Sequence, residues 1–309
     1  MRSSKVLLCA MMVTACAGAE GDVLRSTPDA ATSEASTLDA PTLDAATSDA
    51  ATSDAATSDA PTLDGRLPGD AAPPHPKPEP LMTWQIQLSG GMVDTSAEAR
   101  VYIADFEMPA SVIRTLHSAG RIVICYFSAG TREDFRTDAP DFPTSSLGAS
   151  LPNYPNERWV DIRNPTVRSI MQDRVAKAAR SDCDGVHPSG LAAFLTNTGF
   201  DFTRADQLAY DRLLTAAAHT LGLSIGLVDG DVSLRQDLVA DFDWTIVFGC
   251  LATNCTPAGP FVAARKAAFL VEYGDESRKA EVCPKAKDLG LSAIIKRDAN
   301  LDAFRATCL

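Results

Sequence analysis

The sequence of 309 residues lacks long apolar runs and lacks the spaced motifs of the commonest cofactor sites. No stretch after the N-terminal segment is apolar over the roughly 20 residues that a membrane helix needs. No glycine-rich phosphate fingerprint follows any expected strand, and the 4 histidines stand singly, without metal-ligand spacing. We therefore expect no later membrane helix, no metal and no cofactor.

Positive charge is also scarce, with 28 Lys and Arg against 40 Asp and Glu and a net charge of −12. Residues 17–80 hold 12 of the acidic residues and 3 of the basic ones. Since residues 1–16 contribute +2, about −5 remains for residues 81–309. A mildly acidic domain has no electrostatic footprint for a phosphate backbone, so we expect no nucleic-acid partner.

Residues 1–16 are typical of an export signal. Arg2 and Lys5 precede a short apolar run at residues 6–13, which is too short to span a bilayer. The run ends at Val13-Thr14-Ala15-Cys16, which resembles the lipobox of bacterial lipoproteins, where the cysteine is lipidated. This pattern predicts an exported protein anchored by Cys16 to a bacterial cell envelope. The alternative is an ordinary secretory signal cut near residues 15–19, which would leave a secreted protein.

Residues 17–80 form a low-complexity segment. The unit Thr-Ser-Asp-Ala-Ala repeats at residues 47–60, and prolines alternate at residues 73–80. A five-residue period with almost no large apolar residues gives no core to stack, so the segment is predicted to be a disordered linker.

The remaining residues, 81–309, alternate between strand and helix patterns for about eight rounds, as one (β/α)8 TIM-type barrel would. Expected helices lie at residues 108–119, 204–221 and 279–289, and another begins at Pro165 with Asn164 as its cap. An open doubly wound sheet is the alternative architecture. Strands are expected at residues 83–88, 100–104, 121–127, 159–162, 183–186, 224–228, 244–248, 267–273 and 292–296.

The stretch from Cys183 to Gly190 is the first candidate for chemistry. Val186 is followed by Pro188 and Gly190, which are expected to stop the strand and to turn the backbone. In a barrel of parallel strands such loops converge on one mouth, where active sites usually form.

Several blocks resemble the endo-α-1,4-polygalactosaminidases of glycoside hydrolase family 114. They occur in the family's order over nearly the whole of residues 83–308. The resemblance implies a (β/α) barrel and a secreted enzyme that acts on galactosamine-containing polysaccharide. The blocks are Trp84-Gln85-Ile86-Gln87-Leu88-Ser89-Gly90, Cys125-Tyr126-Phe127-Ser128-Ala129-Gly130, Glu157-Arg158-Trp159-Val160-Asp161-Ile162-Arg163, Cys183-Asp184-Gly185-Val186, Thr198-Gly199-Phe200 and Glu272-Tyr273.

The residues that carry the family's reaction are replaced. The family block Asp-Gly-Val-Glu-Pro-Asp-Asn, whose second Asp is catalytic, continues here with His187, Pro188, Ser189 and Gly190. Phe248 stands where the resemblance implies the partner glutamate. Glycoside hydrolysis needs two carboxyl groups, and neither a serine hydroxyl nor a phenyl ring supplies one. The leading hypothesis is a degenerate glycosidase that retains at most carbohydrate binding.

Two alternatives stay open. One is an active glycosidase with relocated carboxylates, in which His187 could shuttle protons near its usual pKa of ~6.5. The other is a structural or adhesive surface module; in either case we expect a monomer. Against a catalytic role, the acidic side chains could simply bind backbone amides or form turns. The candidate pocket comprises Asp105, Tyr126, Ser128, Glu133, Asp184, His187, Ser189, Asp229, Asp231 and Glu272.

Six cysteines in residues 81–309 form an even set in an exported chain. Six cysteines allow fifteen pairings. The positions of the expected strands and loops favour Cys125 with Cys183, Cys250 with Cys255, and Cys283 with Cys308.

Overall fold

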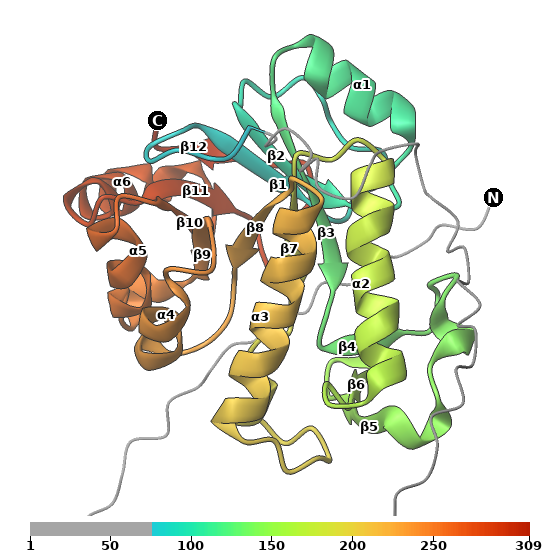
Figure 1. Ribbon diagram of the computed structural model, residues 1–309. Coiled ribbons are helices and arrows are strands. Elements are labelled where there is room, and N and C mark those ends of the chain that lie inside the picture. Colours follow the sequence, from blue (N-terminus) through green and yellow to red (C-terminus); the bar gives the residue numbers. More distant parts are fainter. Residues whose placement is uncertain (1–75) are drawn as a thin grey trace, which may run out of the picture. The chain divides into compact units, whose positions relative to one another are not determined.

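The computed structural model describes residues 76–309 (Figure 1). The expected signal peptide with Cys16, and the linker up to residue 75, lie outside the described residues. None of the helices in the described part is long and apolar enough to cross a membrane.

Eight parallel strands form one curled sheet whose order follows the sequence without reversal. A doubly wound sheet would reverse its strand order at a switch point, so the unbroken order identifies the TIM-type barrel. A short ninth strand, β12 (Ala306–Thr307), pairs antiparallel to the last parallel strand. The parallel strands are β1 (Trp84–Gln87), β2 (Val101–Asp105), β3 (Ile122–Ser128), β7 (Gly185–Ser189), β8 (Ser224–Leu227), β9 (Trp244–Phe248), β10 (Ala267–Tyr273) and β11 (Ser292–Lys296).

Side chains and the C-terminal segment close the gap between β1 and β11, which share no backbone ladder within the described residues. The indole of Trp84 donates a hydrogen bond to the carbonyl of Ser292 at 2.8 Å. The ammonium group of Lys296 donates to the carbonyl of Ile86 at 3.0 Å. Beyond the end of β1, the amide of Leu88 donates to the carbonyl of Leu301 at 2.9 Å.

Helices cover the outer face of the sheet (Figure 1). The predicted caps are confirmed: Asn164 accepts from the second residue of its helix, and Thr203 with Asp206 forms a capping box. The helices are α1 (Ala110–Ser118), α2 (Pro165–Arg180), α3 (Arg204–Thr220), α4 (Val232–Leu238), α5 (Gly259–Ala263) and α6 (Lys279–Asp288). Short 3₁₀ turns lie at η1 (Ala139–Asp141), η2 (Thr144–Ser146), η3 (Ala193–Leu195), η4 (Cys250–Ala252), η5 (Thr256–Ala258) and η6 (Glu276–Arg278).

The strand expected at residues 159–162 is not a barrel strand. Its first two residues end β6 (Tyr154–Val160), which pairs antiparallel with β4 (Thr131–Glu133) and β5 (Leu147–Leu151) in a separate small sheet. Residues 161 and 162 lie beyond the strand. The barrel has no position for it, because β3 pairs directly with β7. Alternating burial looks the same in both kinds of sheet, so the sequence pattern did not distinguish them. The small sheet lies near the carboxyl end of β3 (Figure 1).

The strand expected to stop at Val186 continues to Ser189. Pairing with β8 ends at Val186, whereas pairing with β3 continues as far as Ser189. The carbonyl of Ser189 faces β3 and accepts from the amides of Ala129 and Gly130. The preceding Pro188 therefore faces the side where pairing has ended, and its missing N–H costs no ladder hydrogen bond.

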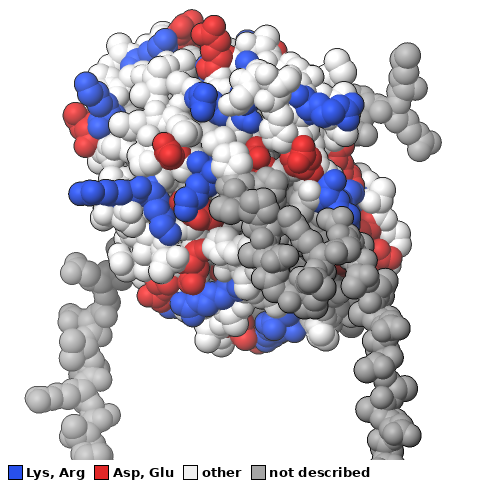
Figure 2. Space-filling view, turned by 45° about the horizontal axis from the view of Figure 1, so that its top comes forward, with Lys and Arg blue, Asp and Glu red and all other residues white. Residues whose placement is uncertain are grey.

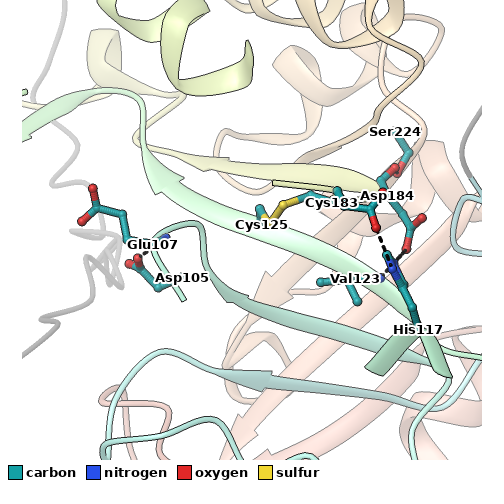
Figure 3. Close-up of a disulfide and its surroundings, with 9 residues drawn as sticks. Asp105, Glu107, His117, Val123, Cys125, Cys183, Asp184 and Ser224 are labelled. Atoms are coloured by element: carbon teal, nitrogen blue, oxygen red, sulfur yellow. Dashed lines mark hydrogen bonds and ion pairs between the residues drawn. A yellow bond between two sulfur atoms is a disulfide. The ribbon is translucent and has the colours of Figure 1, made fainter. Parts of the chain in front are cut away.

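All three predicted disulfides are confirmed. Their Cα–Cα distances are 6.0 Å for Cys125–Cys183, 4.8 Å for Cys250–Cys255 and 5.1 Å for Cys283–Cys308. All three distances fall in the usual range for disulfides. The first bridge joins β3 to the segment that enters β7, within the buried layer under the helices (Figure 3).

The disulfides should differ in their contribution to stability. Cys125–Cys183 closes 58 residues and Cys250–Cys255 closes only 5. Loop-closure entropy predicts about 4 kcal/mol for the first and about 2 kcal/mol for the second. We expect the Cys125→Ala/Cys183→Ala variant to lose about twice as much free energy of unfolding as the matched Cys250→Ala/Cys255→Ala variant. Denaturant titration measures both, and equal losses would contradict the prediction.

Candidate functional site

The carboxyl ends of the parallel strands define the mouth of the barrel. Asp105 ends β2, Ser128 ends β3, Ser189 ends β7 and Phe248 ends β9. Tyr126 lies one inward-facing position below Ser128 on β3. The structure therefore brings together part of the predicted pocket from the three neighbouring strands β2, β3 and β7.

A chain of hydroxyl groups connects β3 to β7 at this mouth. The Tyr126 hydroxyl lies 3.1 Å from the Ser189 Oγ and 3.2 Å from the Ser128 Oγ. All three side chains are buried. Burial, together with the charges of Glu133 and Glu157, raises the pKa of Tyr126 well above its ordinary value, so its hydroxyl stays protonated. The position that the resemblance assigns to a catalytic Asp is thus a neutral hydrogen-bonding group.

Glu157 extends this hydroxyl chain, although the sequence did not single it out. It lies on β6, and its Oε1 accepts from the Thr131 hydroxyl and from the Ser128 Oγ at 3.4 Å. Burial raises the pKa of Glu157 to about 7, the Thr131 hydrogen bond lowers it, and the nearby charge of Glu133 raises it. Near neutral pH this carboxyl group is therefore partly protonated.

The sequence contained one signal for Glu157. Glu157 and Trp159 stand two residues apart, so they share a face of β6, and that face is buried. The expected strand began only at Trp159, which left Glu157 outside it.

Arg136 binds two of the predicted pocket residues. Its guanidinium donates to Asp105 at 2.6 and 2.8 Å and to Glu133 at 2.7 Å, and it also reaches Glu107 at 3.2 Å. Burial alone would lower the pKa of Arg136, but these bonds and charges raise it above its ordinary value. Asp105 and Glu133 therefore serve as counter-charges to a buried cation, and their bonds to it hold them in place.

The surroundings of His187 argue against the proposed proton-shuttle role. Its ring is buried inside the barrel between Tyr126 and Trp244, with ring centroids 5.4 and 5.9 Å away. Burial lowers the pKa of His187 to about 3, so the ring is neutral at physiological pH. Its Nδ1 makes no hydrogen bond within the described residues. The side chain points inward because it alternates with Val186 and Pro188 along β7. The sequence analysis ended this strand at Val186, which left His187 in a loop.

Asp229 and Asp231 follow β8 and hold the backbone. Asp229 Oδ2 accepts from the amides of Gly190 and Leu191 at 2.7 and 3.1 Å, which fixes the turn after Ser189. Burial raises the pKa of Asp229, and these two backbone bonds oppose the rise. Asp231 caps α4 by accepting from the amide of Leu234 at 2.8 Å. Both residues thus hold backbone groups in place.

Asp184 and Glu272 do not belong to the pocket. Asp184 precedes β7, at the opposite end of the strand from the mouth, and accepts from the Val123 amide at 2.7 Å and from His117 at 2.9 Å. Figure 3 shows it beside His117 and Val123, with Asp105 at the far side of the view. Glu272 faces the outer layer and accepts from the Leu251 amide at 2.9 Å. Both side chains bind backbone groups, as the simpler interpretation held.

Phe248 packs against the apolar cluster that fills the barrel and cannot transfer a proton. A hollow of about 610 Å³ lies farther out, around η4, η5 and α5, and none of the hydroxyl-chain residues lines it. Within residues 76–309 no group of three His, Cys, Asp or Glu side chains could hold a metal ion.

On the face shown in Figure 2, acidic and basic side chains are interspersed. The chemistry available at the mouth is therefore hydrogen bonding plus one partly protonated carboxyl group.

The pKa of Glu157 makes stability depend on pH. It is about 7 in the folded chain against an ordinary 4.5, so the folded state holds an extra proton between these values. The contribution of Glu157 to the free energy of unfolding is fully present below pH 4.5. About 3 kcal/mol of it is lost as the pH rises through 7. Between pH 4.5 and 8 the free energy of unfolding of the native chain should therefore fall by about 3 kcal/mol more than that of the Glu157→Gln variant. The exposed Glu98→Gln variant should parallel the native chain, and parallel curves for all three would contradict the prediction.

Comparison with known proteins gives matches at the level of family and structure. The model of glycoside-hydrolase family GH114 matches residues 66–309. The crystal structure of Aspergillus fumigatus Ega3 in complex with galactosamine is 32% identical, with a TM-score of 0.72, and the match covers 78% of this chain and 100% of that one. No curated protein matches the sequence significantly.

A more distant structure shares the fold alone. The glycoside hydrolase domain of PelA from Pseudomonas aeruginosa is 13% identical, with a TM-score of 0.57, and the match covers 73% of this chain and 98% of that domain. The family match spans most of the chain and agrees with the barrel and with the order of the sequence blocks. The chain belongs to glycoside-hydrolase family GH114.

Proposed function

We propose that this protein is an exported lipoprotein whose barrel binds galactosamine-containing polysaccharide without hydrolysing it. The observation that carries the proposal is the state of Ser189. Its hydroxyl occupies the place of the implied catalytic Asp and is hydrogen bonded to Tyr126, so no carboxyl group stands there. Phe248 at the end of β9 removes the second one.

Membership of the family and the similarity to Ega3 support the proposed binding of carbohydrate. Ega3, which shares 32% of its residues with this chain, was crystallised with galactosamine. Hydroxyl and carboxyl groups gathered at one mouth suit a ligand rich in hydroxyl and amino groups.

One observation favours the alternative of an active enzyme with relocated carboxylates. Glu157, with a pKa of about 7, is in the range of a general acid. The second carboxyl group is the difficulty, because Asp105 and Glu133 bind Arg136 and Asp229 binds backbone amides. A single acid without a nucleophile or base does not complete either glycosidase mechanism.

A hydrolysis assay distinguishes binding without cleavage from an active enzyme. Incubated with α-1,4-linked galactosamine oligosaccharides, the protein should release products at least about 10⁴-fold more slowly than a relative that has both carboxyl groups, since losing each costs ~10²–10⁴. Reducing-end release with Ega3 as the positive control measures this. Rapid release would refute the lost-catalysis proposal, and its abolition by Glu157→Gln would establish the alternative.

The anchor is tested separately. Lipidation of Cys16 should place the native protein in the membrane fraction, with residues 17–80 as the tether to the barrel. A Cys16→Ala variant should move to the soluble fraction with its fold unchanged. Equal partition of the two proteins would instead support a secretory signal.

A further inference from the structure

We propose that Glu157 determines specificity for the free amino group of the bound sugar: its Oε2 pairs with the sugar ammonium. This inference rests on the proposed carbohydrate binding. It adds the residue that distinguishes a free amine from an N-acetylated one.

The geometry leaves Glu157 Oε2 available. Oε1 accepts from Thr131 and Ser128, whereas Oε2 takes part in neither bond. Oε2 is also not among the buried side-chain atoms of residues 76–309 that lack a partner, so solvent reaches it. The residue is 4% exposed and is connected through Ser128 and Tyr126 to Ser189, at the position of the implied catalytic residue. A carboxyl oxygen that faces solvent beside this hydroxyl chain can accept from a donor that a ligand brings.

The other acidic groups near Glu157 are already engaged. From β4 and the turn after it, Glu133 and Arg136 bind each other at 2.7 Å, and Arg136 also holds Asp105. On β6 itself, Arg158 donates to the carbonyls of residues 147 and 148 and makes no ion pair with Glu157. From β3, Tyr126 contributes a neutral hydroxyl group. The charge of Arg136 lowers the pKa of Glu157 from a distance, but no described cation forms an ion pair with it. A cation brought by the ligand could therefore form that pair.

Binding of a cation must change the protonation of Glu157. A sugar ammonium close to the carboxyl group favours its ionised form, so the carboxyl O–H bond breaks and the proton passes to the buffer. The sugar stays chemically unchanged and keeps its charge. Since the group titrates at a pKa of about 7, roughly half a proton should leave per site at pH 7. An N-acetylated sugar has no charge to offer and should release none.

Calorimetry tests this on the full chain. Binding of α-1,4-galactosamine hexasaccharide and of its fully N-acetylated form is measured at pH 7, in buffers with small and large ionisation heats. We expect about half a proton to be released with the free amine and none with the N-acetylated form, and about tenfold tighter binding of the free amine. Glu157→Gln should abolish both the proton release and the preference, while the exposed Glu98→Gln should retain them.

The outcomes distinguish the two proposals. Binding of the free amine with no proton release, or an unchanged preference in Glu157→Gln, would refute the assignment of Glu157 and leave carbohydrate binding intact. Failure of both oligosaccharides to bind would refute the proposed function, and the assignment with it. The unfolding curves of Glu157→Gln show separately whether that variant folds.

Discussion

The parallel pairing of β3 with β7 is the constraint on which both the fold and the site depend. Its register sets Ser128 opposite Ser189, so that Tyr126, one inward position below, reaches both hydroxyls. At the entry to the same pair, the Cys125 disulfide and the hydrogen bond from Val123 to Asp184 fix the two strands. Because both ends are fixed, the residues at the mouth have little freedom to rearrange.

Electrostatics then decides what the mouth can do. A buried charge is tolerated only with a partner, and Arg136 serves as that partner for Asp105 and Glu133. Glu157 has no cation and is accommodated as a partly protonated acid. The family's two carboxyl positions hold a serine and a phenylalanine. The result is a mouth that can donate and accept hydrogen bonds and pair with an incoming cation, but that has no second carboxyl group for hydrolysis.

Much of the fold could be predicted, because local rules agree with it. Asn164 and Thr203 cap their helices through contacts within one helical turn, which the local sequence predicts. The Cys125–Cys183 pair follows from two neighbouring strands, and Cys250 and Cys255 share one loop. The failures concern tertiary placement. Residues 159–162 alternate like a barrel strand, yet Trp159 and Val160 end a strand of an added sheet. Pro188 stays in β7 because the neighbouring ladder has ended. His187 and Glu157 were misjudged for the same reason, since burial is set by strands far away in the sequence.

The most direct test of a mouth that binds without cleaving is a crystal structure of the protein after prolonged soaking in an α-1,4-galactosamine oligosaccharide. The proposed function predicts an intact chain of sugars, with an ammonium group beside Glu157 Oε2 and the Tyr126–Ser189 hydrogen bond preserved. A cleaved oligosaccharide across the mouth, or a covalent bond from a sugar to a carboxylate of the protein, would contradict it.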